Sequence, residues 1–154
     1  MKAFKTMVRY AVVGLFILFP LLSRGADSNM PVPGLIEAGL ELWPKGGGPD
    51  ATLGVWQKGG LMEGSSKASR EAGYLKSLSR ALGNYKSYEL IQSKGVSRNS
   101  QVIYLSINFE RGVVYGRLLL YQTAKDWVVQ NMDFSERPEA VMPWLAFEGE
   151  RATE

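Results

Sequence analysis

The chain contains no cysteine and no histidine. Without cysteine it forms no disulfide, no thiolate nucleophile and no cysteine-ligated metal site. Histidine titrates near neutral pH and is the commonest metal ligand, so its absence excludes Ser-His-Asp triads, His-Asp acid-base pairs and His-rich zinc sites. The composition therefore predicts neither a metal site nor a cofactor, in a chain whose 154 residues suffice for one domain with its own core.

Most of the chain also lacks an excess of positive charge. The formal net charge is +3, but Lys2, Lys5, Arg9 and Arg24 lie in the first 25 residues, which contain no acid. The remaining residues hold 14 basic and 15 acidic side chains, a net charge of −1. A nucleic-acid partner is therefore not predicted, because such partners require a basic surface.

Residues 1–25 have the three parts of a secretory signal peptide: a basic start, an apolar run over residues 11–22, and small residues before a cleavage point. Cleavage after Gly25 would place Ser23 and Gly25 at the positions that need small side chains. The prediction is a periplasmic or secreted protein with no membrane attachment after cleavage. The alternative is a retained anchor, although a run of about 12 apolar residues containing Pro20 is shorter than the ~20 that a spanning helix needs.

The sequence predicts a flexible arm over residues 26–34, a single domain over residues 35–143 and a charged tail over residues 144–154. Apolar spacing predicts helices over residues 35–43, over residues 51–58 with Asp50 as N-cap, and from Ser65 or Ser66 to Leu82. The glycine-rich run 45–49 lacks the strand and the Lys-Ser/Thr pair of a phosphate-binding loop, so it is interpreted as a flexible connector.

The third predicted helix has an apolar stripe and a basic outer side. The stripe comprises Ala68, Ala72, Leu75, Leu78 and Leu82, and the outer side carries Lys67, Arg70, Lys76 and Arg80. Gly83 and Asn84 tolerate the left-handed turn that often ends a helix.

Four predicted strands follow, over residues 86–93, 100–110, 113–121 and 127–134. Turns at residues 95–99, 110–112 and 123–126 are short enough to force antiparallel neighbours. The sequence therefore predicts an α+β domain in which N-terminal helices cover one face of a four-stranded antiparallel meander. The dry face is expected to comprise Ile103, Leu105, Ile107, Leu118, Leu120, Met132 and Phe134.

The second half of this sheet resembles the NTF2-like and cystatin-like α+β domains. The resemblance is carried by residues 109–112, 118–123 and 126–134, followed by Pro138, Glu139 and Ala140, and it covers residues 35–143. It implies N-terminal helices that fill a cone made by a curved sheet. The segment 125–134 is similar to the last strand of small exported bacterial proteins of this kind without known activity. The catalytic NTF2-like enzymes use His with Asp, and this chain has no His.

The second sheet face carries a polar and aromatic row without an evident structural role. Its members are Tyr104, Ser106, Asn108, Tyr115, Arg117, Tyr121, Asn131 and Asp133. This composition is typical of protein interfaces, so the row predicts a non-catalytic domain that binds a protein partner or forms a homodimer. The alternative interpretation is an ordinary solvated sheet face.

A small-molecule carrier or a His-free enzyme of the NTF2-like kind is the other hypothesis. Its pocket would be lined by Trp43, Trp56, Tyr74, Leu105 and Phe134, although the same aromatic residues also suit a filled core. Asp133 or Glu110 could act as a base only if buried beside Tyr115 or Arg117. The overall prediction is that the protein is not an enzyme.

Overall fold

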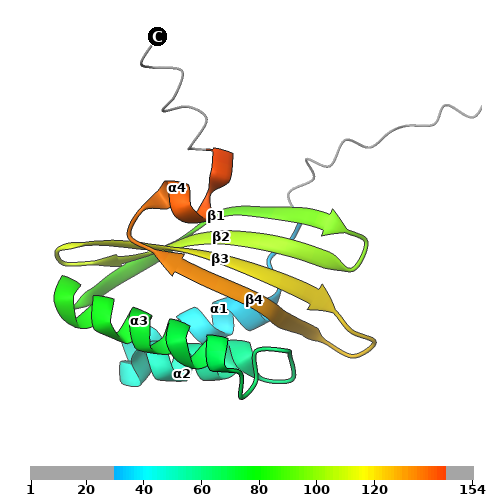
Figure 1. Cartoon of the computed structure of the whole chain (residues 1–154), viewed down its shortest axis with the longest axis horizontal. Coiled ribbons are helices and arrows are strands. Elements are labelled where there is room, and N and C mark those ends of the chain that lie inside the picture. The colour runs from blue at the N-terminus through cyan, green and yellow to red at the C-terminus, as the bar shows by residue number, and fades with distance from the viewer. Residues whose placement is uncertain (1–29, 145–154) are drawn as a thin grey trace, which may run out of the picture.

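The computed structural model of the protein describes residues 30–144 (Figure 1). The predicted signal peptide, residues 26–29 of the predicted arm and all of the predicted tail except Trp144 lie outside the described residues. Within residues 30–144, no helix is long and apolar enough to cross a membrane.

Four strands form one antiparallel sheet in chain order, as predicted. They are β1 (Tyr85–Ser97), β2 (Ser100–Phe109), β3 (Gly112–Gln122) and β4 (Trp127–Ser135). Strand β1 runs past residue 93, where its prediction ended, because the bend to β2 is confined to Arg98 and Asn99. Register shifts at three points along β1 interrupt the alternation of its side chains, which explains its irregular sequence pattern.

Helices α1 (Gly34–Leu40), α2 (Gly48–Gln57) and α3 (Ser66–Leu82) precede the sheet, with a kinked helical turn, η1 (Trp43–Gly47), between α1 and α2. The prediction of a flexible connector over residues 45–49 is wrong. Gly46 has a φ of 85°, which lets the chain turn directly from η1 into α2. Asp50 was predicted to be the N-cap of α2, but the N-cap is Gly47. Asp50 lies in the first turn of the helix.

The two predicted ends of α3 are confirmed. Of the two serines expected to begin the helix, Ser65 is the N-cap: its hydroxyl accepts a hydrogen bond from the backbone N–H of Ala68 at 3.0 Å. At the other end, Gly83 has a φ of 87° and stops the helix.

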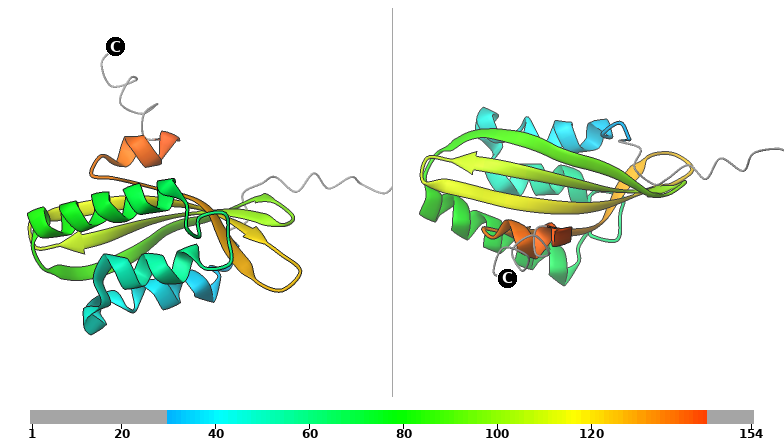
Figure 2. Two further views of the ribbon diagram at one scale, coloured as in Figure 1. Left: turned by 60° about the horizontal axis from the view of Figure 1, so that its bottom comes forward. Right: turned by 90° about the horizontal axis from the view of Figure 1, so that it is seen from above.

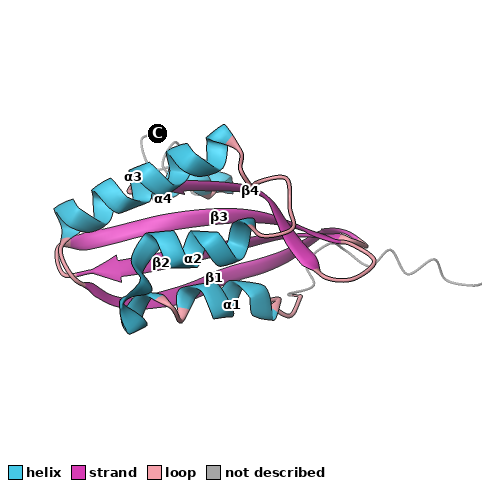
Figure 3. Ribbon diagram, turned by 90° about the horizontal axis from the view of Figure 1, so that it is seen from below, coloured by secondary structure: helices cyan, strands magenta, loops and turns pink. Residues whose placement is uncertain are grey.

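The sheet has helices on both faces. Helices α1, α2 and α3 lie side by side across one face, with α2 in the middle and α3 along β4 (Figure 3). A short fourth helix, α4 (Pro138–Val141), lies on the opposite face (Figures 1 and 2). The sequence does not predict α4, because four residues are too few to show a helical period.

The core lies between the three N-terminal helices and the sheet. All seven residues of the predicted dry face are buried in it. From the helices they meet Ile36, Leu40, Trp43, Leu53, Trp56 and Leu75. The α+β architecture with a four-stranded meander therefore follows from burying one face of the sheet under amphipathic helices.

Candidate functional site

The register of the sheet brings the centre of the predicted row together. Tyr104 on β2 is paired with Arg117 on β3, which is in turn paired with Asp133 on β4. Because side chains alternate along each strand, all three lie on the face opposite the main core. We call this surface the outer face.

Two members of the row are buried, and one of them, Tyr104, is covered by the C-terminal segment. Tyr104 is only 7% exposed and packs with Val141 and Met142 in a second, small apolar cluster. The ring of Trp144 meets the Tyr104 ring edge to face, with centroids 4.5 Å apart. Ser106 is buried as well. Neither Tyr104 nor Ser106 is therefore available to a partner, and Trp144 belongs to this cover in place of the predicted tail.

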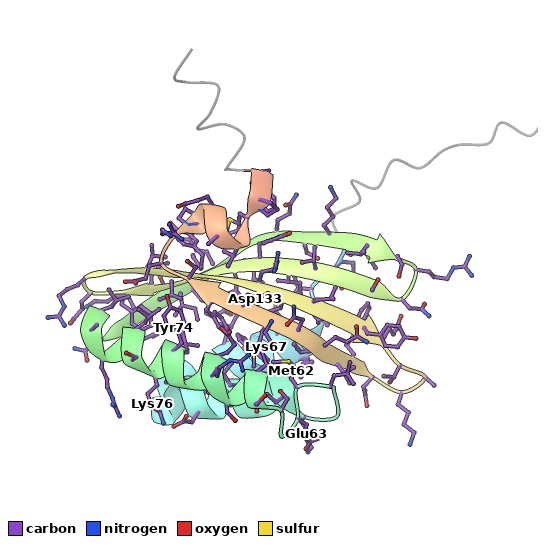
Figure 4. The ribbon with its side chains drawn as sticks, in the orientation of Figure 1. Met62, Glu63, Lys67, Tyr74, Lys76 and Asp133 are labelled. Carbon is purple, nitrogen blue, oxygen red and sulfur yellow. The ribbon has the colours of Figure 1, made fainter. Side chains whose placement is uncertain are left out.

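Asp133 is the centre of a charged cluster that joins α3 to the sheet. Its carboxylate accepts from Lys67 Nζ at 2.7 Å and from Arg117 Nη2 at 2.8 Å. Lys67 also donates to Asn131 Oδ1. Figure 4 shows Lys67 pointing from α3 toward Asp133. Lys67 was expected on the outer side of its helix, but it reaches across the β4 edge because α3 lies directly beside that strand.

The two cations set the protonation of Asp133. Burial alone would raise the pKa of Asp133, but the hydrogen bonds and positive charges of Lys67 and Arg117 outweigh it and lower the pKa. A proton acceptor works best with a pKa near the ambient pH. Asp133 is therefore an anchoring carboxylate and a weak base.

Glu71 lies next to this cluster and shows the opposite shift. Burial raises the pKa of Glu71, and the negative charge of Asp133 adds to the increase. A hydrogen bond with the backbone of Phe134 and the charge of Lys67 work against it. Strand β4 is an edge strand, so one side of its backbone has no neighbouring strand. Glu71 provides a hydrogen-bond partner for the backbone of Phe134 at this edge.

The remaining members of the row are spread out. Asn108 donates to Ser87 and Glu89 on β1, near the opposite end of the sheet. Tyr115 is half-buried beside the α4 cover. Tyr121 is 39% exposed near the end of β3 and is the most accessible aromatic residue of the row.

Glu110 does not join the row. It lies in the β2–β3 turn, where its carboxylate accepts from Asn84 and pairs with Lys86 at 3.4 Å. These contacts, the Asn84 side chain first, lower the pKa of Glu110. It is neither buried nor placed beside Tyr115 or Arg117, so the condition for a catalytic role is not met.

Most of the residues predicted to line a pocket pack in the main core. Trp43 packs on Tyr85 and Phe109, and Trp56 stacks on Phe134 with ring centroids 6.4 Å apart. Leu105 is fully buried. Tyr74 is 40% exposed on α3 and is not part of the main core cluster. These rings therefore belong to the core between the helices and the sheet, which agrees with the second of the two interpretations that the sequence allowed.

The structure does contain a pocket at another place. It has a volume of about 760 Å³ and lies where the start of α1, the end of α2 and the β3–β4 turn meet. We call it the end pocket. Its lining comprises Pro33, Gly34, Leu35, Val55, Lys58, Gly59, Thr123, Lys125, Asp126, Trp127 and Val128.

Other known proteins provide no further guide. Comparison of the chain with protein families, with curated proteins and with solved structures finds no match. In the part of the chain that the structure describes, no group of three acidic residues is placed to hold a metal ion.

Sequence reasoning missed Lys67 and Glu71, the α4 cover and the end pocket. Lys67 and Glu71 are four residues apart and so share one side of α3, a spacing that is visible in the sequence. Val141 and Met142 form an apolar pair just after Pro138, a detectable sign of a second small core. The end pocket has no such sign, because its walls come from three segments far apart in the chain.

Proposed function

We propose that the protein is a non-catalytic binding domain that engages another protein, in the simplest case a second copy of itself, through the uncovered part of the outer face. The observation that carries this proposal is the exposure of two large aromatic residues, Tyr121 and Trp144, on that face. Aromatic residues are enriched at the centres of protein interfaces.

The neighbouring surface suits a docking role. Half-buried Leu119 precedes Tyr121 by two residues and shares its face of β3. A shallow groove of about 290 Å³ lies between Trp144 and β1, lined by Gln92, Lys94 and Tyr104. The outer face therefore combines exposed aromatic rings with polar groups at their margin.

The contacts and the lowered pKa of Asp133 favour a binding role over a catalytic one. The half-buried Asp133 is occupied by two cations, and its pKa is lowered. The alternative, a carrier or a His-free enzyme, requires a pocket between the helices and the sheet. Trp43 packs on Phe109 there, and Trp56 stacks on Phe134. We therefore keep the outer face as the proposed binding surface.

A matched pair of substitutions tests self-association. Tyr121 and Tyr74 are 39% and 40% exposed but lie on the outer face and on α3 respectively. We expect sedimentation velocity to show a dimer that Tyr121→Arg converts to a monomer and that Tyr74→Arg leaves intact. A wild-type monomer at all concentrations would exclude the homodimer and leave only a different protein as the partner.

We further propose that the domain is of the NTF2-like or cystatin-like kind and that it is exported. The first proposal is supported by N-terminal helices on one face of a twisted meander, and the second by the pattern of residues 1–25. N-terminal sequencing of protein from the periplasm or medium should begin at Ala26. A first residue of Met1 would contradict the proposed cleavage.

A further inference from the structure

We propose that the end pocket binds an amphipathic anion, an apolar chain that carries one carboxylate head. This pocket shares no lining residue with the groove beside Trp144. The proposal rests on three features of the pocket: its apolar walls, its two lysines and the hydrogen bonds that hold its rim.

The walls supply the apolar part. Leu35 comes from α1, Val55 from α2, and Trp127 and Val128 from the start of β4. Leu35, Val55 and Trp127 are half-buried and pack against the main core on one side. Their other side faces a volume of about 760 Å³, within the size range of small-molecule pockets.

The charge at the rim is positive. Lys58 follows the last residue of α2, and Lys125 lies in the β3–β4 turn. Among residues 30–144, neither ammonium group forms an ion pair with a carboxylate. Asp126 is the one acidic residue of the lining, so the lining carries a net charge of +1. This balance favours a ligand with a single negative charge.

The rim is held in place before any ligand binds. In the β3–β4 turn, the Thr123 hydroxyl accepts from the backbone N–H groups of Lys125 and Asp126 and donates to the Asp126 carbonyl. On the opposite side, the chain leading to Pro33 is fixed to β1, because Met30 donates to the Ser93 carbonyl and accepts from the Ser93 hydroxyl. A preformed site costs less conformational entropy on binding.

The probe is dodecanoate, titrated into the purified protein by calorimetry below its aggregation concentration. Dodecanol and dodecyltrimethylammonium have the same chain with a neutral and a cationic head. We expect dodecanoate to bind at one site and more tightly than either analogue. Absence of binding, or equal affinity for all three heads, would overturn the proposal.

Substitutions then locate the site. Lys58→Gln and Lys125→Gln should each weaken dodecanoate binding by roughly three- to tenfold and leave dodecanol unaffected. Arg80→Gln removes one positive charge from the last turn of α3, outside the lining, and should change nothing. All three residues are exposed, so none of these variants should impair folding. If Arg80→Gln weakens dodecanoate binding as much as the two pocket variants do, binding depends only on the net charge of the protein, and the proposed site is refuted.

A further variant tests the apolar wall. Val55→Trp places a larger side chain in the pocket and should weaken the binding of both dodecanoate and dodecanol by roughly tenfold or more. If this variant fails to fold, Trp127→Ala tests the same wall from β4, and unchanged affinity in a folded variant would contradict the proposal. Trp144→Ala changes the outer face outside the pocket lining and should not alter binding, which separates this test from that of the outer face.

Discussion

Replacing Gly39 by alanine should destabilise the protein, although alanine is the better helix former. Gly39 lies in the last turn of α1, directly against Trp56 of α2. A Cβ atom at position 39 would lie 2.8 Å from Trp56 Cδ1 and closer still to Nε1. Real Cβ contacts are not this short, so either the backbone of α1 or the indole ring must move.

The ring has little freedom to move. Trp56 is fully buried, stacks on Phe134, and donates from Nε1 to the carbonyl of Ile36 at 3.2 Å. Overpacking of a filled core costs about 1–3 kcal/mol, and loss of the indole hydrogen bond costs about 1 kcal/mol. The gain from alanine in a helix is about 1 kcal/mol. The free energy of unfolding should therefore fall by about 1–3 kcal/mol for Gly39→Ala.

Gly54→Ala in α2 is the matched control. It makes the same chemical change in a neighbouring helix, at an exposed position where a Cβ would meet nothing within 4 Å. This variant should be more stable than the wild type by up to about 1 kcal/mol. Urea denaturation followed by far-UV circular dichroism measures both values. Stabilisation of the protein by Gly39→Ala as well as by Gly54→Ala would refute the close packing of α1 on Trp56.

The two carboxylates beside α3 should depend on pH in opposite directions. The pKa of Asp133 is lowered below its usual 3.8, so its charge stabilises the fold above pH 3.8 and this contribution is lost as the pH falls below that value. Asp133→Asn should therefore lower the free energy of unfolding at pH 7 by about 1 kcal/mol, since solvent screens the partly exposed Lys67 and Arg117, and the difference should shrink near pH 3. The pKa of Glu71 is raised above its usual 4.5, so the stability that the neutral acid provides is lost as the pH rises through the raised pKa. Glu71→Gln should match the wild type at pH 4 and be more stable at pH 7, as measured by urea denaturation at each pH; the same pH dependence for both variants would contradict the assignment.

Local patterns were sufficient where a single element determines the outcome. The alternation in residues 100–109 placed Ile103, Leu105 and Ile107 in the core, because side-chain direction in a strand follows from position alone. The start of α3 was located to Ser65 or Ser66 and its end to Gly83, because capping depends on a few neighbouring residues.

The candidate site was only partly predictable, because it depends on contacts between segments that are distant in the chain. Alternation placed Arg117 and Asp133 on one face, and the strand register then paired them. The same alternation could not show that Val141 and Met142 would return to cover Tyr104. That cover depends on where the chain travels after β4, which no local pattern records.

The amino-acid sequence by itself determined the order of the three N-terminal helices and the four strands, the meander and the face of the sheet that is buried, because each follows from the spacing of apolar residues within one segment. Only the tertiary structure decided that Lys67 crosses the β4 edge to Asp133, that α4 closes part of the outer face, and that Leu35, Val55 and Trp127 surround a pocket. These contacts join residues distant in the chain, and their geometry is set by how the helices pack across the sheet.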